Sequence, residues 1–271
     1  MSTIERTVGD VLRDWRRRRH VSQLDLASEV GVSSRHLSFL ETGRSRPSRE
    51  MLLRLAEGLD VPLRERNALL VAGGFAPVFP ERPLSDPALD AVRQAVDVVL
   101  KGHEPYPALA VDRTWNLLAA NRSAQLFLQG IPDHLTTPPV NVLRLCFHPD
   151  GLVSRIRNRR VLLPQLIARL GHEIAATADP RLEALRDELL AYPVMREIGA
   201  RRRPPRPEIV VLFELESEAG VLRFISTTTV FGTAADVTVD ELTIESFFPA
   251  DAETATTIRA LVEGQEHDVH S

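Results

Sequence analysis

The chain has 271 residues, of which 44% are hydrophobic and 26% are charged, and its formal net charge is −4. This is the composition of a globular protein with one large domain or two smaller ones. Cys146 is the only cysteine, which excludes an internal disulfide, and the sequence has no run of about eighteen apolar residues that would predict a transmembrane helix. The N-terminus has no apolar secretory signal, so we expect a cytoplasmic protein without membrane insertion.

Charge is distributed unevenly along the chain. Residues 1–80 hold 13 arginines and 10 acidic residues, which gives a net charge of +3, whereas the remainder carries −7. A basic N-terminal part in an acidic chain is typical of a segment that faces nucleic acid, although so small an excess is also compatible with an ordinary solvated surface.

Capping residues and apolar spacing predict five short helices between residues 8 and 72. Ser22, Ser33 and Ser48 each precede one of the helical segments, where a serine hydroxyl can accept a hydrogen bond from an exposed amide of the first turn. Pro62 suits the first turn of the last segment, because the amide hydrogen that proline lacks has no partner there.

The second and third segments form a characteristic pair. Ala27 is small enough for the next helix to cross over it, Gly31 can adopt the positive φ of a tight turn, and Leu37 and Leu40 share one apolar face. This pattern predicts a helix-turn-helix; the alternative is two unrelated amphipathic helices in a bundle.

The stretch SQLDLASEVGVSSRHLSFLETGRSRPS, with its LETG element and the basic loop after it, resembles the lambda-repressor-like, xenobiotic-response-element (XRE) family of helix-turn-helix regulators. The resemblance covers residues 8–72 and implies an all-α, five-helix DNA-binding domain. In this family the second helix of the motif enters the major groove of double-stranded DNA with its N-terminus first. We therefore expect a sequence-specific transcriptional regulator that binds DNA as a homodimer.

We predict DNA contacts at the start of the reading helix, before it, and on the loop after it: Gln23, Ser33, Ser34, Arg35, Ser38, Gly43, Arg44 and Arg46. Arg35 can bind the O6/N7 edge of a guanine with two hydrogen bonds. Arg44 and Arg46 are expected to bind phosphates, which sets the register of the protein without reading sequence.

Two residues of the reading helix leave alternatives open. Phe39 either contacts a thymine methyl group or turns back into the core, and we favour the core. Glu41 is acidic beside the groove, so we expect it to orient a basic neighbour such as Arg35 and not to contact DNA.

A second domain follows the helices. We place the DNA-binding domain at residues 1–76, a proline-rich linker at 77–87, and the second domain at 88–265. The second domain reads as a helix, a strand–turn–strand over 107–121, a long helical stretch, and three strand-like runs over 208–248. This order predicts an α+β domain with a five-stranded antiparallel sheet and helices on one side.

The stretches YPALAVDRTWNLLAANRSAQ, NVLRLCFHPDG and TIESFFPAD resemble the MmyB-like ligand-binding domain, a PAS-like sensor module. The segment IRNRRVLL lacks the tryptophan that this family has after its Arg-Asn pair. The resemblance implies a small apolar ligand such as a fatty acid, held between sheet and helices.

The candidate ligand contacts are apolar residues for the cavity and polar residues for its mouth: Trp115, Leu117, Phe127, Asn141, Arg144, Phe147, His148, Phe213, Phe224 and Phe231. Each apolar residue can equally be simple core, and the polar ones can instead tie helix ends to loops.

No motif of catalysis is present in the sequence. It contains no H-E-x-x-H, G-x-S-x-G, Walker or G-x-G-x-x-G pattern, so we expect no enzyme, no cofactor and no metal site. The alternative function is a regulator or antitoxin whose second domain is a dimerisation or protein-partner module without ligand.

Overall fold

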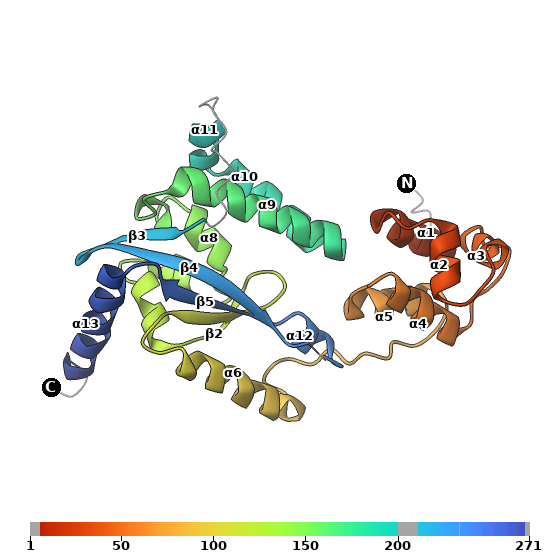
Figure 1. Ribbon diagram of the computed structural model, residues 1–271, viewed down its shortest axis with the longest axis horizontal. Coiled ribbons are helices and arrows are strands. Elements are labelled where there is room, and N and C mark those ends of the chain that lie inside the picture. The colour runs from red at the N-terminus through yellow and green to blue at the C-terminus, as the bar shows by residue number, and fades with distance from the viewer. Residues whose placement is uncertain (1–5, 200–210, 233, 269–271) are drawn as a thin grey trace. The chain divides into compact units, whose positions relative to one another are not determined.

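The computed structural model describes residues 6–199, 211–232 and 234–268. The chain divides into two compact units, shown in Figure 1. The N-terminal unit comprises Met1–Pro83 together with Thr233–Asp240, and the C-terminal unit comprises Leu84–Gly232 and Glu241–Ser271. Residues 233–240, which the sequence analysis placed in the second domain, thus group with the first.

Five helices build the N-terminal unit: α1 (Val8–Arg18), α2 (Gln23–Glu29), α3 (Ser34–Glu41), α4 (Arg49–Gly58) and α5 (Leu63–Ala72). The hydroxyl groups of Ser22, Ser33 and Ser48 accept hydrogen bonds from the third amide of α2, α3 and α4, as predicted. Leucines from all five helices form the core. The predicted lambda-repressor-like helical fold is confirmed.

The turn between α2 and α3 depends on small residues. Gly31 has a φ of +70°, and the amide of Val32 donates to the carbonyl oxygen of Ala27 at 2.8 Å. Gly9 is needed where α1 crosses α3, because a side chain there would collide with the carbonyl oxygen of Leu40. Helices α2 and α3 and the turn between them therefore form a helix-turn-helix.

The first part of the predicted linker is bound to α5. The side-chain oxygen of Asn67 accepts hydrogen bonds from the amides of Val78 and Phe79, and its amide group donates to the carbonyl oxygen of Phe79. Residues 78–79 are therefore a fixed part of the N-terminal unit and not a free connection.

The N-terminal unit also contains a short helix from far along the chain, α12 (Val237–Asp240), which packs on α5. The sequence predicts a strand in this segment, and that prediction is wrong. Asp236 accepts a hydrogen bond from the amide of Thr238 and starts a helical turn, and Val237 is fully buried. The amide of Val237 donates to the carbonyl oxygen of Pro80 at 2.8 Å.

The C-terminal unit is built on one sheet of five strands: β1 (Ala108–Val111), β2 (Leu117–Ala120), β3 (Phe213–Ser217), β4 (Gly220–Val230) and β5 (Thr243–Pro249). Their order is β2-β1-β5-β4-β3, and every neighbouring pair is antiparallel. The predicted α+β fold with a five-stranded sheet is confirmed. Residues 208–210, where the first of the three predicted runs begins, lie outside the described residues.

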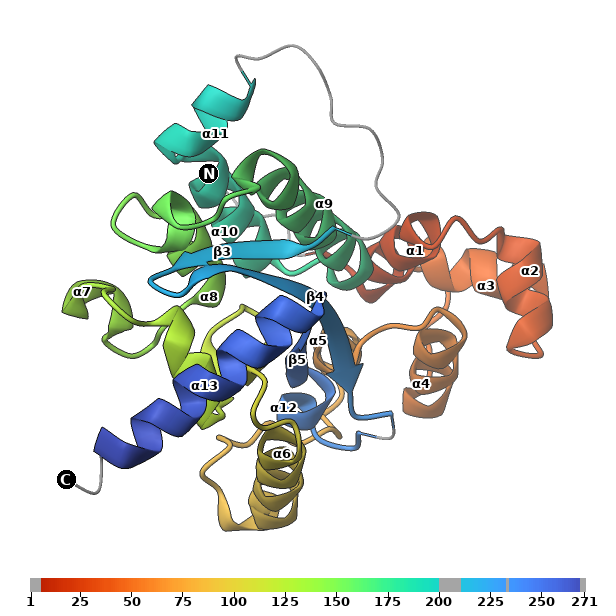
Figure 2. The same ribbon diagram turned by 60° about the vertical axis from the view of Figure 1, so that its left-hand side comes forward.

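The other elements of the C-terminal unit are the α-helices α6 (Asp90–Gly102), α7 (Asp133–Thr136), α8 (Val142–Phe147), α9 (Arg159–Thr177), α10 (Pro180–Ala191), α11 (Pro193–Gly199) and α13 (Ala252–Asp268), with 3-10 turns η1 (Pro87–Leu89), η2 (Arg122–Phe127) and η3 (Leu152–Ser154). Figure 2 shows α13 crossing in front of the sheet and α9 with α10 beside β3.

Helices cover both faces of the sheet, which corrects the predicted one-sided arrangement. Leu109 and Val111 belong to the core formed with α8, α9 and α10, whereas Ala108 and Ala110 pack with Val96 and the rest of α6. Successive residues of a strand point to opposite faces, so a β1 that is buried at all four positions needs a layer on each side.

Candidate DNA-binding surface and ligand cavity

The N-terminus of α3 presents short polar side chains to solvent. Ser33 caps the helix by accepting a hydrogen bond from the amide of His36 at 3.1 Å. Ser34 and Arg35 are exposed, and Ser38 is half-buried one turn further along. A helix end with small side chains lets another backbone approach closely, which is what insertion into a major groove requires.

Phe39 lies beside two arginines and is only half-buried. Its ring is half-buried, with the Arg35 guanidinium carbon 5.4 Å and the Arg44 guanidinium carbon 5.9 Å from the ring centre. Such cation–π contacts hold a flexible arginine on one side of a ring. The two arginines that we predicted to contact DNA are therefore organised by a shared aromatic residue.

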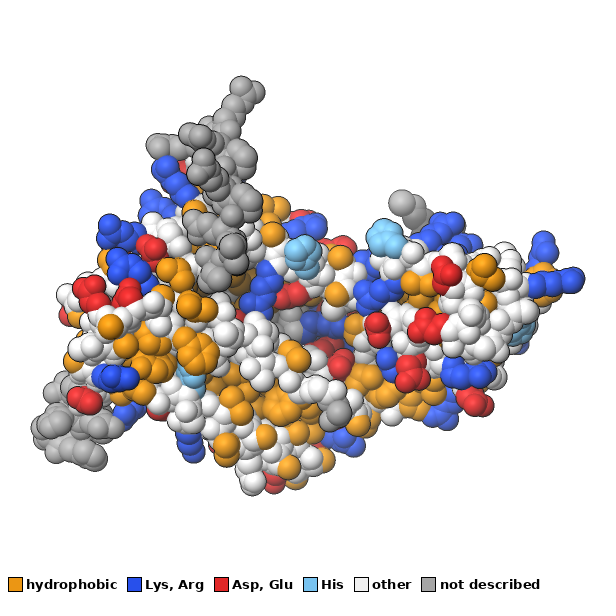
Figure 3. Space-filling model, viewed as in Figure 1, with side chains coloured by type: hydrophobic (Ala, Val, Ile, Leu, Met, Phe, Trp, Pro, Cys, Tyr) orange, Lys and Arg blue, Asp and Glu red, His pale blue; other side chains and the backbone are white. Residues whose placement is uncertain are grey.

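The loop after α3 is a tight turn that exposes two predicted phosphate contacts. Gly43 has a φ of +71°, and the amides of Arg44 and Ser45 both donate to the carbonyl oxygen of Phe39. Arg44 and Arg46 are exposed. In Figure 3 basic side chains protrude at the edge of the N-terminal unit where α3 lies.

Glu41 is paired with Arg16 of α1 and not with Arg35. The Arg16 guanidinium donates two hydrogen bonds to the Glu41 carboxylate, at 2.6 and 2.9 Å, and Gln23 donates a third at 2.8 Å. Burial raises the pKa of Glu41, but these hydrogen bonds more than offset it and hold the pKa below its ordinary value. Glu41 therefore joins α1, α2 and α3, and the side-chain amide of Gln23 takes part in this network.

The C-terminal unit contains an apolar cavity of about 130 Å³ between the sheet and the helices α8 and α9. Four of the predicted ligand contacts line it: Trp115, Leu117, Phe127 and Phe213. Phe247 of β5 and residues of η2 add further apolar surface. Burial raises the pKa of the Cys146 thiol in this lining to about 12, so the thiol is neutral at physiological pH.

The other predicted aromatic contacts do not line the cavity. Phe147 and Phe224 are fully buried in the core of the unit. Phe231 packs with the α6 cluster on the opposite face of the sheet. Their place in the packing, which periodicity does not reveal, separates them from the cavity.

The predicted polar contacts also lie outside the cavity lining. Asn141 caps α8 and donates to the carbonyl oxygen of Thr114 at 2.7 Å. Arg144 forms an ion pair with Glu188 on α10 at 2.7 Å. His148 packs edge-on against other rings. These residues tie helix ends together, which was the alternative left open by the sequence.

The polar residues at the cavity are ones that the sequence analysis did not single out. Arg169 of α9 and Glu245 of β5 both line it. The two terminal guanidinium nitrogens of Arg169 donate hydrogen bonds to the two carboxylate oxygens of Glu245, at 2.6 and 3.2 Å. Arg169 also bonds Glu173 at 3.2 Å and lies 4.5 Å from the centre of the Trp115 ring. Burial raises the pKa of Glu173 above its ordinary value. An Arg and a Glu four residues apart on a mostly apolar helix were the available signal.

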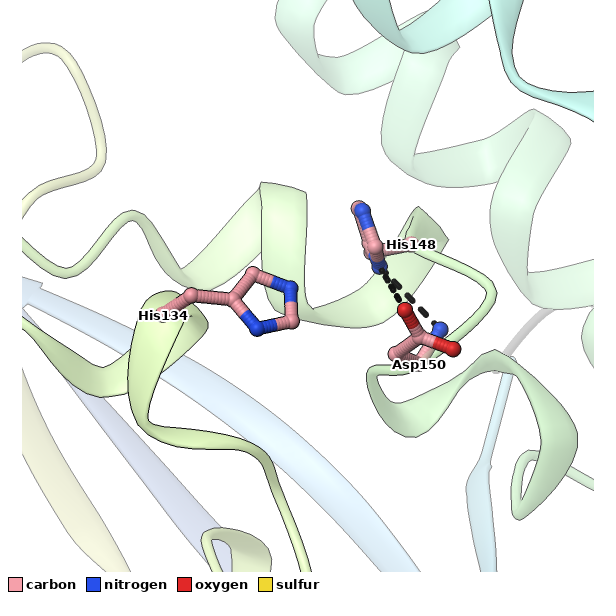
Figure 4. A group of neighbouring side chains, drawn as sticks. All are labelled: His134, His148 and Asp150. Carbon is pink, nitrogen blue, oxygen red and sulfur yellow. Dashed lines mark hydrogen bonds and ion pairs between the residues drawn. The ribbon is translucent and has the colours of Figure 1, made fainter.

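Three side chains with metal-binding groups meet on the surface of the same unit. The ligand-type atoms of His134, His148 and Asp150 lie within 4.8 Å of one another, and Figure 4 shows His134 facing the other two. Nδ1 of His148 already accepts a hydrogen bond from the amide of Asp150 at 3.1 Å. His134 and Asp150 are exposed, so the arrangement is an open surface cluster.

In the part of the chain that the structure describes, each helix is too short or too polar to cross a membrane.

An exposed helix-turn-helix joined in one chain to a cavity-bearing α+β unit is the arrangement of a two-domain helix-turn-helix regulator. Residues 12–66 match a helix-turn-helix family model, and residues 92–261, more than half of the chain, match the model of the MmyB-like transcription regulator ligand binding domain. The chain therefore belongs to the MmyB-like transcription regulators, and the predicted family is confirmed.

Two similar proteins carry related descriptions. An HTH-type transcriptional regulatory protein of Methanoculleus marisnigri is 32% identical over 124 residues, which are 44% of this chain and 40% of that protein. The chain thus matches less than half the length of this relative. The crystal structure of the clp gene regulator ClgR from Corynebacterium glutamicum is 25% identical, covers 38% of this chain and 97% of its own, and has a TM-score of 0.23.

Proposed function

We propose that this regulator binds a specific duplex site as a homodimer through α3 and the loop after it, and that a small apolar molecule in the cavity changes its affinity for DNA. It acts without catalysis, in the cytoplasm. The observation that carries the proposal is the pair of sites in one chain: an exposed helix N-terminus with Arg35 and Arg44 ordered on Phe39, and an apolar cavity in a separate unit.

Dimerisation follows from the size of the reading surface. A single domain of this size buries little surface on DNA, whereas two copies on half-sites about one helical turn apart reach useful affinity. An inverted repeat is the operator form that matches a two-fold symmetric dimer.

Replacing Arg35 with alanine is expected to relax the base preference at one step of each half-site. The loss of one bidentate contact costs about 1–3 kcal/mol of discrimination. Selection from a randomised-site library measures this directly. An unchanged preference would show that another face of α3 reads the bases.

Arg44→Ala is the matched control, because Arg44 shares the Phe39 ring but is assigned to phosphate. It is expected to weaken binding to all sequences alike and to lower the slope of log K against log salt by about one.

The connection between the two sites supports sensing. Strands β4 and β5 both contribute to the cavity wall, through Ser226 and through Glu245 with Phe247. The chain between these two strands includes α12, which belongs to the N-terminal unit. A ligand that prefers one arrangement of β4 and β5 thereby biases a segment of the DNA-binding unit, as coupling between sites requires.

Filling the cavity tests the sensing half of the proposal. Leu166→Trp places a larger side chain in the lining, whereas Leu190→Trp makes the same change at an exposed position of α10. The unaltered chain and the Leu190 variant, purified from the native host, are expected to retain a small-molecule adduct in native mass spectrometry, and the Leu166 variant to lose it.

A dimerisation or protein-partner module predicts a different result. In that case no chain carries an adduct, and both variants keep the thermal stability and DNA affinity of the unaltered chain in the presence of a lipid panel that includes fatty acids.

A further inference from the structure

We propose that the cavity takes an apolar molecule of about one aromatic ring whose polar group is a hydrogen-bond donor, an amine or a hydroxyl, and that it discriminates against carboxylates such as fatty acids. This inference rests on the proposed ligand-sensing function. It is carried by the hydrogen-bond inventory and the charge of the cluster at the cavity wall.

The cation at the cavity is already neutralised. Arg169 donates through its Nε to Glu173 and through its two terminal nitrogens to Glu245. One guanidinium therefore serves two carboxylates, and Glu245 is only 5% exposed at its side chain. A ligand carboxylate entering here would have to displace one of them or remain an unpaired buried anion, and both are costly.

Acceptors outnumber donors in the same cluster. The carboxyl groups of Glu173 and Glu245 together offer about eight lone-pair positions when both are ionised. The donors that meet them are Arg169, the Trp115 indole nitrogen on Glu173 at 2.8 Å, and the Thr228 hydroxyl on Glu245 at 3.1 Å. The surplus of acceptor positions favours a ligand that brings an N–H or O–H group, and a cationic one gains from the excess negative charge.

The register of the sheet fixes where this polar group must lie. Ser226 of β4 pairs with Phe247 of β5, and both line the cavity together with Glu245. Thr228, which pairs with Glu245, lies on the same face of the sheet outside the lining. Arg169 covers the ring of Trp115 from the side of α9. Apart from Gln125, the remaining wall is apolar, so most of the ligand meets apolar surface.

The size of the cavity limits the ligand in the same direction. Its volume of about 130 Å³ is close to that of an engineered protein cavity of about 150 Å³ that binds benzene. A body of one ring is enough to fill this volume. Aromatic side chains in the wall also favour a ring in offset or edge-on contact.

Three probes on one carbon skeleton test the inference with the full-length chain: 2-phenylethanol, 2-phenylethylamine and phenylacetate. Dissociation constants are measured by calorimetry, with thermal stability as a second readout. We expect the dissociation constants of the alcohol and the amine to be lower than that of phenylacetate by about ten-fold or more, because only they bring a donor to an acceptor-rich site.

A charge-changing variant inverts the preference if the cluster is responsible. Glu245→Gln keeps the shape but removes one carboxylate from Arg169, so phenylacetate is expected to improve about ten-fold and the amine to weaken. Glu183→Gln, an exposed position on α10, is the matched control and should change neither value. If Glu245→Gln does not fold, as judged by near-UV circular dichroism, Glu173→Gln makes the same test at the second carboxylate.

The possible failures are distinct. Phenylacetate or dodecanoate binding to the unaltered chain as tightly as the alcohol would overturn the donor preference while supporting ligand sensing. If none of the probes binds or shifts thermal stability, and Leu166→Trp leaves DNA binding and stability unaltered, both the inference and the sensing function are wrong.

Discussion

Replacing Glu41 with alanine is expected to destabilise the N-terminal unit by about 3–5 kcal/mol, because the substitution leaves a buried arginine without its partner. The Glu41 side chain is 2% exposed and that of Arg16 is 12% exposed. Removal of the carboxylate also leaves the side-chain amide of Gln23 on α2 without this acceptor. The loss is measured by urea unfolding, followed through Trp15 fluorescence in a Trp115→Phe background, since the chain has only these two tryptophans.

Two comparisons isolate the cause. The exposed pair of Arg6 and Asp14 has side chains 63% and 51% exposed, so Asp14→Ala should cost about 1 kcal/mol or less. The double variant Arg16→Met with Glu41→Leu replaces the pair by apolar side chains and should recover most of the loss. A cost for Glu41→Ala as small as that for Asp14→Ala would contradict the structural role of the pair.

The same pair makes stability depend on acidity. Because the pKa of Glu41 is lower in the folded state than in the unfolded chain, its contribution is fully present above the unfolded value of about 4.3 and is lost as the pH falls through the folded value. The N-terminal unit of the unaltered chain should therefore lose stability below about pH 4. Glu41→Gln should be less stable at neutral pH and show a weaker dependence in this range.

Val237→Asp is expected to detach α12 from the N-terminal unit and to disconnect the cavity from DNA binding. Val237 is fully buried against the unit, so burial worth about 1.5–3 kcal/mol is lost and a charge cannot take its place. Basal DNA affinity should persist, because α3 is not altered. The proposed ligand-induced change in DNA affinity, on the order of 1–3 kcal/mol where sites are coupled, should disappear.

Val98→Asp is the matched control, since Val98 on α6 is 70% exposed. DNA affinity titrated with and without a bound probe distinguishes the two variants. A Val237→Asp chain that still responds to ligand would show that the signal travels by another route.

Local sequence was sufficient for the DNA-binding helices. Serine caps, the small residues Ala27 and Gly31, and the apolar face of Leu37 and Leu40 act within one or two helical turns, and the structure follows them. Strand patterns in the second unit were also readable, because alternation and turn residues are local. The exposed positions of Arg35 and Arg44 could be predicted for the same reason.

The partners of charged and aromatic side chains could be found only from the tertiary structure. Arg16 and Glu41 are 25 residues apart, and Arg169 and Glu245 are 76 apart. Phe39 was expected in the core, but its ring is half-buried beside two arginine guanidinium groups. Such contacts are set by how helices and strands cross, which no periodicity encodes.

The sequence by itself determined the class of the protein: a lambda-repressor-like helix-turn-helix domain followed by an antiparallel α+β domain of the MmyB-like family. Only the tertiary structure decided which residues wall the cavity, that its arginine is neutralised by two carboxylates, and that α12 belongs to the DNA-binding unit. The physical reason is that helices and turns are stabilised by neighbours in the chain, whereas a cavity and its charge balance arise where distant segments meet.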